Sequence, residues 1–139
     1  MLHYEEVNGS QTHIMALYRL LRNRKFSVSH DTLPEYKEHE KFVKNHPYRT
    51  WQIIYNSDEP AGSFYIAKDN AIGINLGVDD VSMSREIIVW IFENWSPLSA
   101  VKSVRPAHFF MRVPIGNDHL VQAIKESKGN LVEKVFIFP

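Results

Sequence analysis

Histidines and acidic residues are the side chains of this sequence that could carry chemistry near neutral pH. The imidazole group gains and loses a proton in that range, which makes histidine the usual general base or acid. Seven histidines are spread along the chain, namely His3, His13, His30, His39, His46, His108 and His119. An acidic pair, Asp79-Asp80, follows an apolar run. Such a pair either binds an ammonium group or marks a turn before a helix.

Several other chemistries lack their residues. The sequence has no cysteine, which excludes disulfides, thiolate nucleophiles and cysteine-based zinc sites. It has no H-E-x-x-H, no G-x-S-x-G elbow and no phosphate loop of the form G-x-x-x-x-G-K-[ST]. His39 and His46 lie about two helical turns apart, too far to share one ion. We therefore expect no metal.

Length and charge indicate the class of protein. The chain has 139 residues, 44% of them hydrophobic, which suits one domain over residues 1–139 with a substantial core. Sixteen Lys and Arg balance sixteen Asp and Glu, so the basic surplus typical of nucleic-acid binders is absent. The N-terminus lacks the pattern of a signal peptide, and no apolar run reaches the ~20 residues that span a bilayer. The sequence predicts a cytoplasmic protein that binds neither nucleic acid nor membrane.

The acidic pair belongs to a stretch, residues 71–95, around which the other elements can be arranged. The first part alternates as a strand, with Ile72, Ile74, Leu76 and Val78 on one face and Ala71, Gly73, Asn75 and Gly77 on the other. The second face is almost bare, so either a packed helix or the backbone of an extended ligand can lie against it. A helix from about Ser82 to Trp95 follows, and its apolar residues on several sides predict a buried position.

The other elements follow from periodicity and turn signals. We expect an edge strand at 2–7, a helix from Ser10 to about Asn23, and a helix from Thr32 to about Pro47 with a capping box formed by Thr32 and Glu35. Strands at 50–56 and 62–67 lead to the central stretch. A strand at 107–113, a helix capped by Asn117 or Asp118, and a strand at 131–138 complete the chain. The order β-α-α-β-β-β-α-β-α-β predicts an α/β (α+β) fold with a mixed, mostly antiparallel sheet flanked by helices.

This order and length resemble the GCN5-related N-acetyltransferase superfamily, whose members transfer an acyl group from acyl-CoA, usually to an amine. The most specific likeness is N-terminal. Leu21-Arg22-Asn23, the run from Glu38 to Val43, Trp51-Gln52-Ile53-Ile54 and Gly62-Ser63-Phe64 are similar to the branch that acts on amino sugars of nucleotide-sugar pathways.

The resemblance implies acetyl-CoA or another acyl-CoA as co-substrate, and a set of residues to hold it. In that family the pantetheine arm lies between the strand before the central helix and the next strand. The implied pantetheine contacts are the backbone groups of Asn75, Leu76, Gly77 and Val78. The implied pyrophosphate contacts are Ser82, Met83, Ser84 and Arg85, with Asn117 contributing from the last helix.

Two family motifs differ here. The pyrophosphate loop normally reads Q/R-x-x-G-x-G/A, whereas neither glycine is present in residues 81–86. Backbone N–H groups at this helix N-terminus can still bind an anion, but Ser82 or Ser84 acting as a plain helix cap explains the residues equally well. Lys125 stands where the family has a tyrosine that often protonates the leaving thiolate, and a solvated charge is the alternative explanation for it.

The resemblance gives two hypotheses. In the first, the protein is an N-acyltransferase for a small amine or amino sugar, with His108 or His30 as base and with Asp79 and Asp80 binding the acceptor. In the second, it is a non-catalytic domain of this fold that binds a ligand or partner, which the missing glycines and tyrosine favour. The protein is expected to be a monomer or a homodimer.

Overall fold

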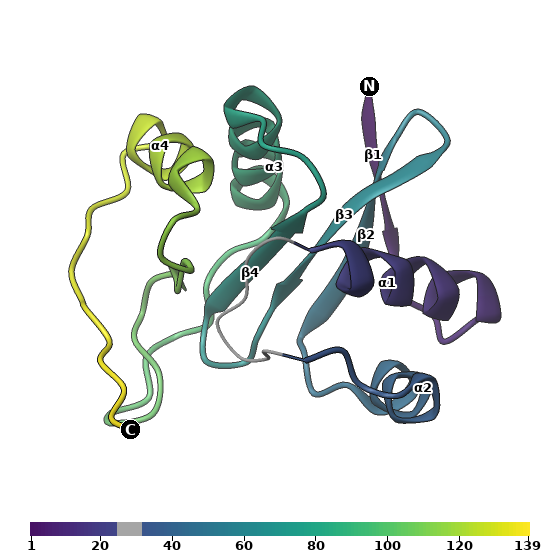
Figure 1. Cartoon of the computed structure of the whole chain (residues 1–139). Coiled ribbons are helices and arrows are strands. Elements are labelled where there is room, and N and C mark those ends of the chain that lie inside the picture. Colours follow the sequence, from purple (N-terminus) through teal and green to yellow (C-terminus); the bar gives the residue numbers. More distant parts are fainter. Residues whose placement is uncertain (25–31) are drawn as a thin grey trace.

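The computed structural model describes residues 1–24 and 32–139. Five strands form one sheet in the order β1-β2-β3-β4-β5, and helices pack on both faces (Figure 1). Helices α1 and α2 cover one face, while α3 and α4 cover the other. The elements are β1 (Leu2–Glu6), α1 (Gln11–Asn23), α2 (Tyr36–Asn45), β2 (Thr50–Asn56), β3 (Glu59–Ile66), β4 (Ala71–Leu76), α3 (Val81–Asn94), β5 (Phe110–Met111) and α4 (Asp118–Glu126). The mixed α/β fold expected from the sequence is confirmed.

The first four strands form an antiparallel meander, and β5 alone pairs in parallel. The turns between strands require left-handed backbone at Ser57 (φ 58°) and Asn70 (φ 76°). Serine is less usual at such a position than asparagine, whose side chain tolerates this conformation. The meander predicted from residues 50 to 76 is therefore present.

The core lies on both faces of the sheet because β2 is covered on both sides. Ile53 packs with α1 and α2, while Ile54 packs with α3. Both side chains are fully buried. This explains why Ile54 interrupts the polar-apolar alternation of the strand, since a strand buried on two faces needs no polar side.

Helix starts agree with the sequence in part. Ser10 caps α1, its Oγ accepting from the N–H of His13 at 3.2 Å. Helix α2 begins at Tyr36 rather than at Thr32, and its N-cap residue Glu35 makes no side-chain capping bond. The expected capping box is therefore wrong.

Helix α3 is less buried than its composition predicts. Val89 and Phe92 on its outer side are 46% and 52% exposed, whereas Ile87 and Ile91 are fully buried. Trp90 stacks on Tyr4 of β1 with ring centroids 3.9 Å apart. None of the helices in the described part of the chain is long and apolar enough to cross a membrane.

The last third of the chain differs most from expectation. The strand expected at 107–113 is reduced to Phe110–Met111, and residues 130–139 have no regular secondary structure, so the strand expected at 131–138 is not formed. An eight-residue strand needs a neighbour for its backbone N–H and C=O groups. This segment makes no such pairing within the described residues.

Candidate functional site

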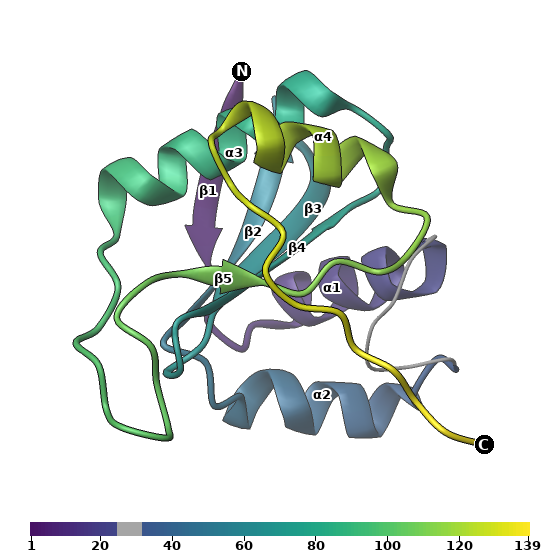
Figure 2. The same ribbon diagram turned by 90° about the vertical axis from the view of Figure 1, so that its left-hand side faces the viewer.

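The candidate site begins where β4 and β5 separate. The two strands pair only through Ala71 with Phe110 and Ile72 with Met111. Beyond these pairs β4 continues toward α3, while the chain after β5 turns toward α4 (Figures 1 and 2). No strand in the described part of the chain pairs with β4 on this side after Ile72. Within the described residues, the divergence leaves one edge of β4 without a strand partner just before a helix N-terminus.

Along β4, the backbone N–H and C=O groups point alternately toward β3 and toward β5. The N–H of Gly77 donates to Ala61 O beside β3 at 3.0 Å, and the N–H of Phe110 donates to Asn70 O at 3.2 Å. Odd-numbered residues of β4 therefore pair with β3, and even-numbered residues point toward β5. The backbone groups of Ile74 and Leu76 consequently face the side where β5 has moved away.

Two glycines, Gly73 within β4 and Gly77 just after it, have different surroundings. At Gly73 a Cβ atom would lie 2.0 Å from Cε2 of Tyr65, so this glycine makes room for a cross-strand aromatic ring. Tyr48 stacks on that ring at 4.2 Å. At Gly77 the nearest described atom to an added Cβ is Ala61 O at 3.6 Å, an ordinary van der Waals contact, so the described residues would accommodate a Cβ there. Among the described residues, packing therefore accounts for the glycine at 73 but not for the one at 77.

The two tyrosines are poor proton donors because they are partly buried. Burial raises the pKa of Tyr48 to about 12, and the neighbouring Tyr65 adds to the shift. The pKa of Tyr65 is raised by burial and by Asp69, and Arg112 opposes the shift. Both phenols stay protonated at neutral pH. Their two stacked rings lie together on this face of the sheet.

A carboxylate side chain caps the N-terminus of α3. Asp80 is the N-cap residue of α3, and its Oδ1 accepts from the N–H of Met83 at 2.9 Å. The carbonyl of Asp80 accepts from the N–H of Ser84 at 3.0 Å. Neither Ser82 nor Ser84 is the cap, and Ser84 is buried. The N–H of Arg85 belongs to the hydrogen-bond ladder of the helix itself, so three of the four N–H groups expected to bind pyrophosphate are already bonded.

Other residues expected to bind the cofactor have different partners. Arg85 donates from Nη1 to Glu126 at 2.9 Å on α4. Asn117 is the N-cap residue of α4, and its Oδ1 accepts from the N–H of Leu120 at 3.4 Å. Val78 is half exposed and lies in the turn. Among the described residues, no acceptor contacts the N–H groups of Val81 and Ser82.

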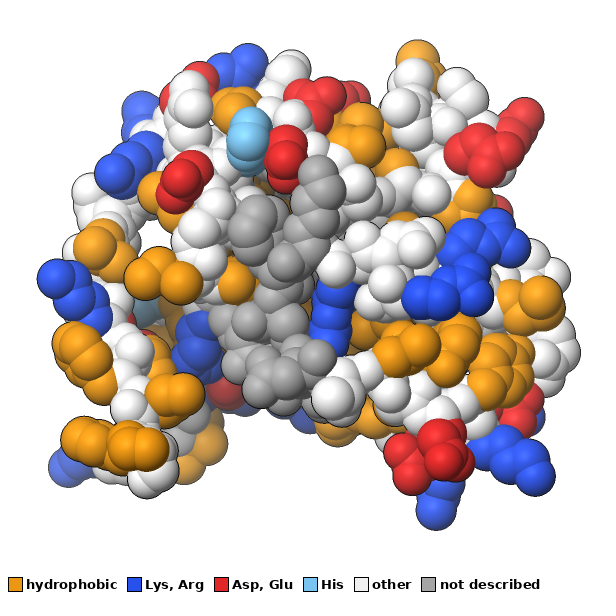
Figure 3. All heavy atoms as spheres, viewed as in Figure 1, with side chains coloured by type: hydrophobic (Ala, Val, Ile, Leu, Met, Phe, Trp, Pro, Cys, Tyr) orange, Lys and Arg blue, Asp and Glu red, His pale blue; other side chains and the backbone are white. Residues whose placement is uncertain are grey.

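A histidine that sequence reasoning did not single out lies beside the acidic pair. His119 Nδ1 is 3.9 Å from Asp79 Oδ1, and both side chains are partly exposed. The contact is an ion pair only when the imidazole is protonated. Figure 3 shows a histidine among acidic side chains over α3 and α4. Forty positions separate the two residues in the sequence, and no motif connects them.

The two histidines proposed from sequence are not at this place. His108 is exposed and precedes β5, beside the start of β4. The acidic pair follows the end of β4, on the order of 20 Å away at about 3.3 Å per strand residue. His30 lies outside the described residues. Lys125 is exposed in the last turn of α4, as expected of a solvated charge.

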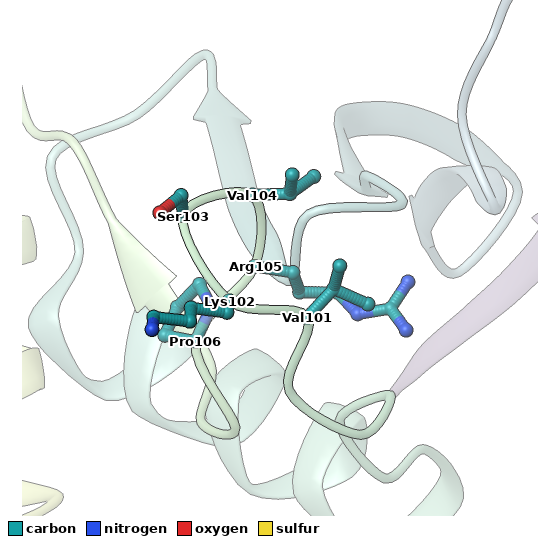
Figure 4. Close-up of a pocket in the computed structure, with 6 residues that line it drawn as sticks. All are labelled: Val101, Lys102, Ser103, Val104, Arg105 and Pro106. Carbon is teal, nitrogen blue, oxygen red and sulfur yellow. The ribbon is translucent and has the colours of Figure 1, made fainter.

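A shallow depression of about 360 Å³ lies in the loop before β5. Six consecutive residues of that loop, Val101 to Pro106, line it (Figure 4). The Arg105 side chain there donates to Ser99 O at 2.7 Å and Lys68 O at 3.1 Å. These two hydrogen bonds tie the Arg105 guanidinium group to the backbone of the loop and of the β3–β4 turn. Among the described residues, no group of three or more His, Asp or Glu side chains could hold a metal ion.

Comparisons with known proteins give no relative. No family model matches the chain, and no curated protein or solved structure matches it either.

Proposed function

We propose that this chain is an acyl-CoA-dependent N-acyltransferase, with acetyl-CoA as donor and a small amine or amino sugar as acceptor. The observation that carries the proposal is the separation of β4 from β5 after Ile72, directly before the N-terminus of α3. An exposed strand edge can hydrogen-bond an extended amide-containing chain. The pantetheine arm of an acyl-CoA is such a chain.

The residues present fit the pantetheine arm better than the pyrophosphate. The backbone groups of Ile74 and Leu76 face the open edge, and Gly77 leaves space beside it. For the pyrophosphate, the N–H groups of Val81 and Ser82 remain as donors at the positive end of a helix dipole. The Asp80 carboxylate beside them opposes a second negative charge. We therefore expect donor affinity to come mainly from the pantetheine.

Proton transfer is assigned to His119. The bound donor supplies a thioester carbonyl, and an amine can attack it only after losing its ammonium proton. The His119 imidazole can accept that proton, and Asp79 at 3.9 Å would stabilise the resulting imidazolium. The Asp79 carboxylate beside His119 is also assigned to attract the acceptor ammonium.

One specific observation favours a second candidate, a non-catalytic domain of this fold that binds a ligand or partner. The Asp80 carboxylate occupies the Met83 N–H, which an anion would otherwise contact. A helix N-terminus that is capped internally needs no phosphate for its stability. In this alternative the open edge of β4 binds something other than a CoA thioester.

Calorimetry separates the two candidates. A specific ligand at 100 times its Kd stabilises the folded state by about 2.7 kcal/mol. We expect acetyl-CoA and acetyl-pantetheine to raise the unfolding temperature, and Gly77→Val to remove both shifts. Asn56→Val adds the same side chain at an exposed position of β2 and is the matched control. If millimolar acetyl-CoA leaves the native protein unshifted, the acyltransferase proposal is abandoned for the second candidate.

A further inference from the structure

The segment from residue 131 to residue 138 is apolar and exposed. Six of its eight side chains are hydrophobic and between 70% and 92% exposed, namely Leu131, Val132, Val135, Phe136, Ile137 and Phe138. Figure 3 shows hydrophobic side chains along the left-hand edge, where Figure 1 places this segment. Contiguous exposure of this kind marks an interaction surface.

The composition of the segment is that of a strand buried on both faces. It is rich in β-branched and aromatic residues, and successive side chains would point to opposite sides. Leu131, Val135 and Ile137 would lie on one side and Val132, Phe136 and Phe138 on the other. Each side has one charge, Glu133 or Lys134. A strand with two apolar sides fits a sheet covered by helices on both faces, as this sheet is.

The sheet has an unpaired edge at β5. The N–H of Phe110 donates to Asn70 O beside β4, so the backbone groups of Met111 point outward by alternation. β5 is the last strand in the sheet order, and no described strand pairs with its outer side. An exposed edge of this kind accepts a further strand.

The segment does not run along the edge of its own β5. It leaves α4 at Gly129, whose N–H donates to Ile124 O at 2.8 Å. A Cβ at Gly129 would lie 2.3 Å from Cγ2 of Ile124, so this helix end is tightly packed. From there the segment crosses the direction of β5 (Figure 2) and runs down the side of the molecule opposite α1 and α2 (Figure 1). Among the described residues of one chain, therefore, neither the 131–138 segment nor the outer edge of β5 pairs with another strand.

We propose that residues 131–138 form a β-strand on the outer edge of β5 in a second copy of this chain, and that the exchange is reciprocal. The six exposed side chains present on the order of 1,000 Å² per copy, so the two exchanged strands alone would bury up to roughly 2,000 Å², enough for a stable interface. Main-chain hydrogen bonds to β5 would fix the direction of the strand. Its two apolar sides would extend the apolar layers on the two faces of the sheet.

Light scattering after size exclusion tests the assembly. We expect the 139-residue chain to elute near twice its 16.2 kDa at micromolar concentrations. Val135→Lys with Ile137→Lys should give a monomer whose thermal unfolding still shows a folded core, since the segment has no hydrogen bond to that core. Val104→Lys with Ile115→Lys changes equally exposed residues elsewhere and should leave the dimer intact. A monomeric native chain, or a dimer that survives the first pair of substitutions, overturns the proposal.

Cross-linking distinguishes exchange from closure within one chain, and the natural absence of cysteine gives it a clean background. Chains carrying Arg112→Cys are mixed with chains carrying Phe136→Cys and treated with a flexible bis-maleimide. We expect a product that joins the two chains. A chain with both cysteines that remains monomeric and cross-links only within itself shows that the segment pairs with its own β5, and the proposal is then wrong.

Discussion

The carboxylate of Asp80 and the backbone N–H of Met83 form a 2.9 Å hydrogen bond at the point where a phosphate would approach α3. A side-chain cap and a bound anion compete for the same donors, because both use the unpaired N–H groups of the first helical turn. The chain therefore carries its own negative group at the candidate pyrophosphate position. For the acyl-CoA that we propose as donor, this relationship should weaken the contact with the pyrophosphate.

Asp80→Asn should tighten acetyl-CoA binding while keeping the helix cap. Asparagine retains the acceptor oxygen for Met83 but removes the charge, and one charge at a helix N-terminus changes the free energy by about 1 kcal/mol, or roughly fivefold in Kd. Titration calorimetry at low salt measures the change. Glu93→Gln removes an equal charge near the far end of α3 and should leave the Kd unaltered. Equal affinities for native and Asp80→Asn protein would refute this account of the loop.

His119→Ala and Asp79→Asn should both lower turnover if the proposed acyl transfer occurs. Loss of a general base typically reduces kcat by 100-fold or more, whereas loss of the charge that stabilises it has a smaller effect. The reduction for His119→Ala should be largest below the pKa of the acceptor amine, where a proton must be removed. A pH profile of kcat/KM with a panel of nucleotide-linked amino sugars gives the measurement. His108→Ala is the comparison, and if it alone abolishes turnover the base has been assigned to the wrong histidine.

Gly73→Ala should destabilise the fold through Tyr65. The added Cβ would lie 2.0 Å from Cε2 and 2.3 Å from Cζ of that ring, so the ring must move from its stacked position on Tyr48. Overpacking of this kind costs about 1–3 kcal/mol of unfolding free energy, measured by urea denaturation. Gly77→Ala places a methyl group at an ordinary contact distance of 3.6 Å from Ala61 O and should cost far less. Tyr65→Ala combined with Gly73→Ala should show less than the sum of the two single losses, and additive losses would contradict a direct clash.

Asn70 should be one of the most sensitive positions outside the core. Its buried side chain donates from Nδ2 to the carbonyls of Leu98 and Pro106 and accepts from the N–H of Leu98, each at 2.8 Å. Its backbone is also left-handed, at φ 76°. We expect Asn70→Gly to lose about 2–3 kcal/mol of unfolding free energy through the missing hydrogen bonds. Asn70→Ala should lose about 1 kcal/mol more, because alanine resists this φ. Comparable values for the two variants would show that the backbone conformation carries no cost.

Stability should fall as the pH decreases below about 6.5, and His39 should contribute to the fall. Burial lowers the pKa of His39, although its hydrogen bond with Ile14 O, at 2.9 Å from Nε2, opposes the shift. A lowered pKa means that the unfolded chain binds more protons than the folded protein in this range. The contribution of His39 is therefore complete above the unfolded-state pKa and is lost as the pH falls.

Urea unfolding at several pH values between 5 and 7.5 measures the contribution of His39. Gln at position 39 can still donate to the Ile14 carbonyl but does not titrate, so His39→Gln should flatten the pH dependence. His108→Gln changes an exposed histidine and should leave the slope unaltered. A native slope retained by His39→Gln would assign the pH dependence to other groups, such as His46, whose pKa burial also lowers.

Local signals in the sequence were sufficient for most of the elements. Ser10 predicted the start of α1, the alternation at residues 50–76 predicted the meander, and Asn117 was one of the two caps expected for α4. Each depends on interactions within a few residues, such as a side-chain cap or a turn, so neighbouring residues carry the information. The cap of α3 was assigned to the wrong residue because aspartate and serine cap equally well, and the sequence does not indicate where the strand ends.

Contacts between distant segments were decided by the tertiary structure alone. The approach of His119 to Asp79 depends on how α4 lies against α3, and the role of Gly73 depends on the cross-strand register that places Tyr65 on it. The 131–138 segment has the composition of a strand, yet a strand forms only where an edge can receive its backbone. By itself, the sequence determined which segments prefer helix or strand, since that preference is local. The separation of β4 from β5 and the partners of each edge arose from packing, because hydrogen-bond pairing across a sheet joins residues that the sequence keeps far apart.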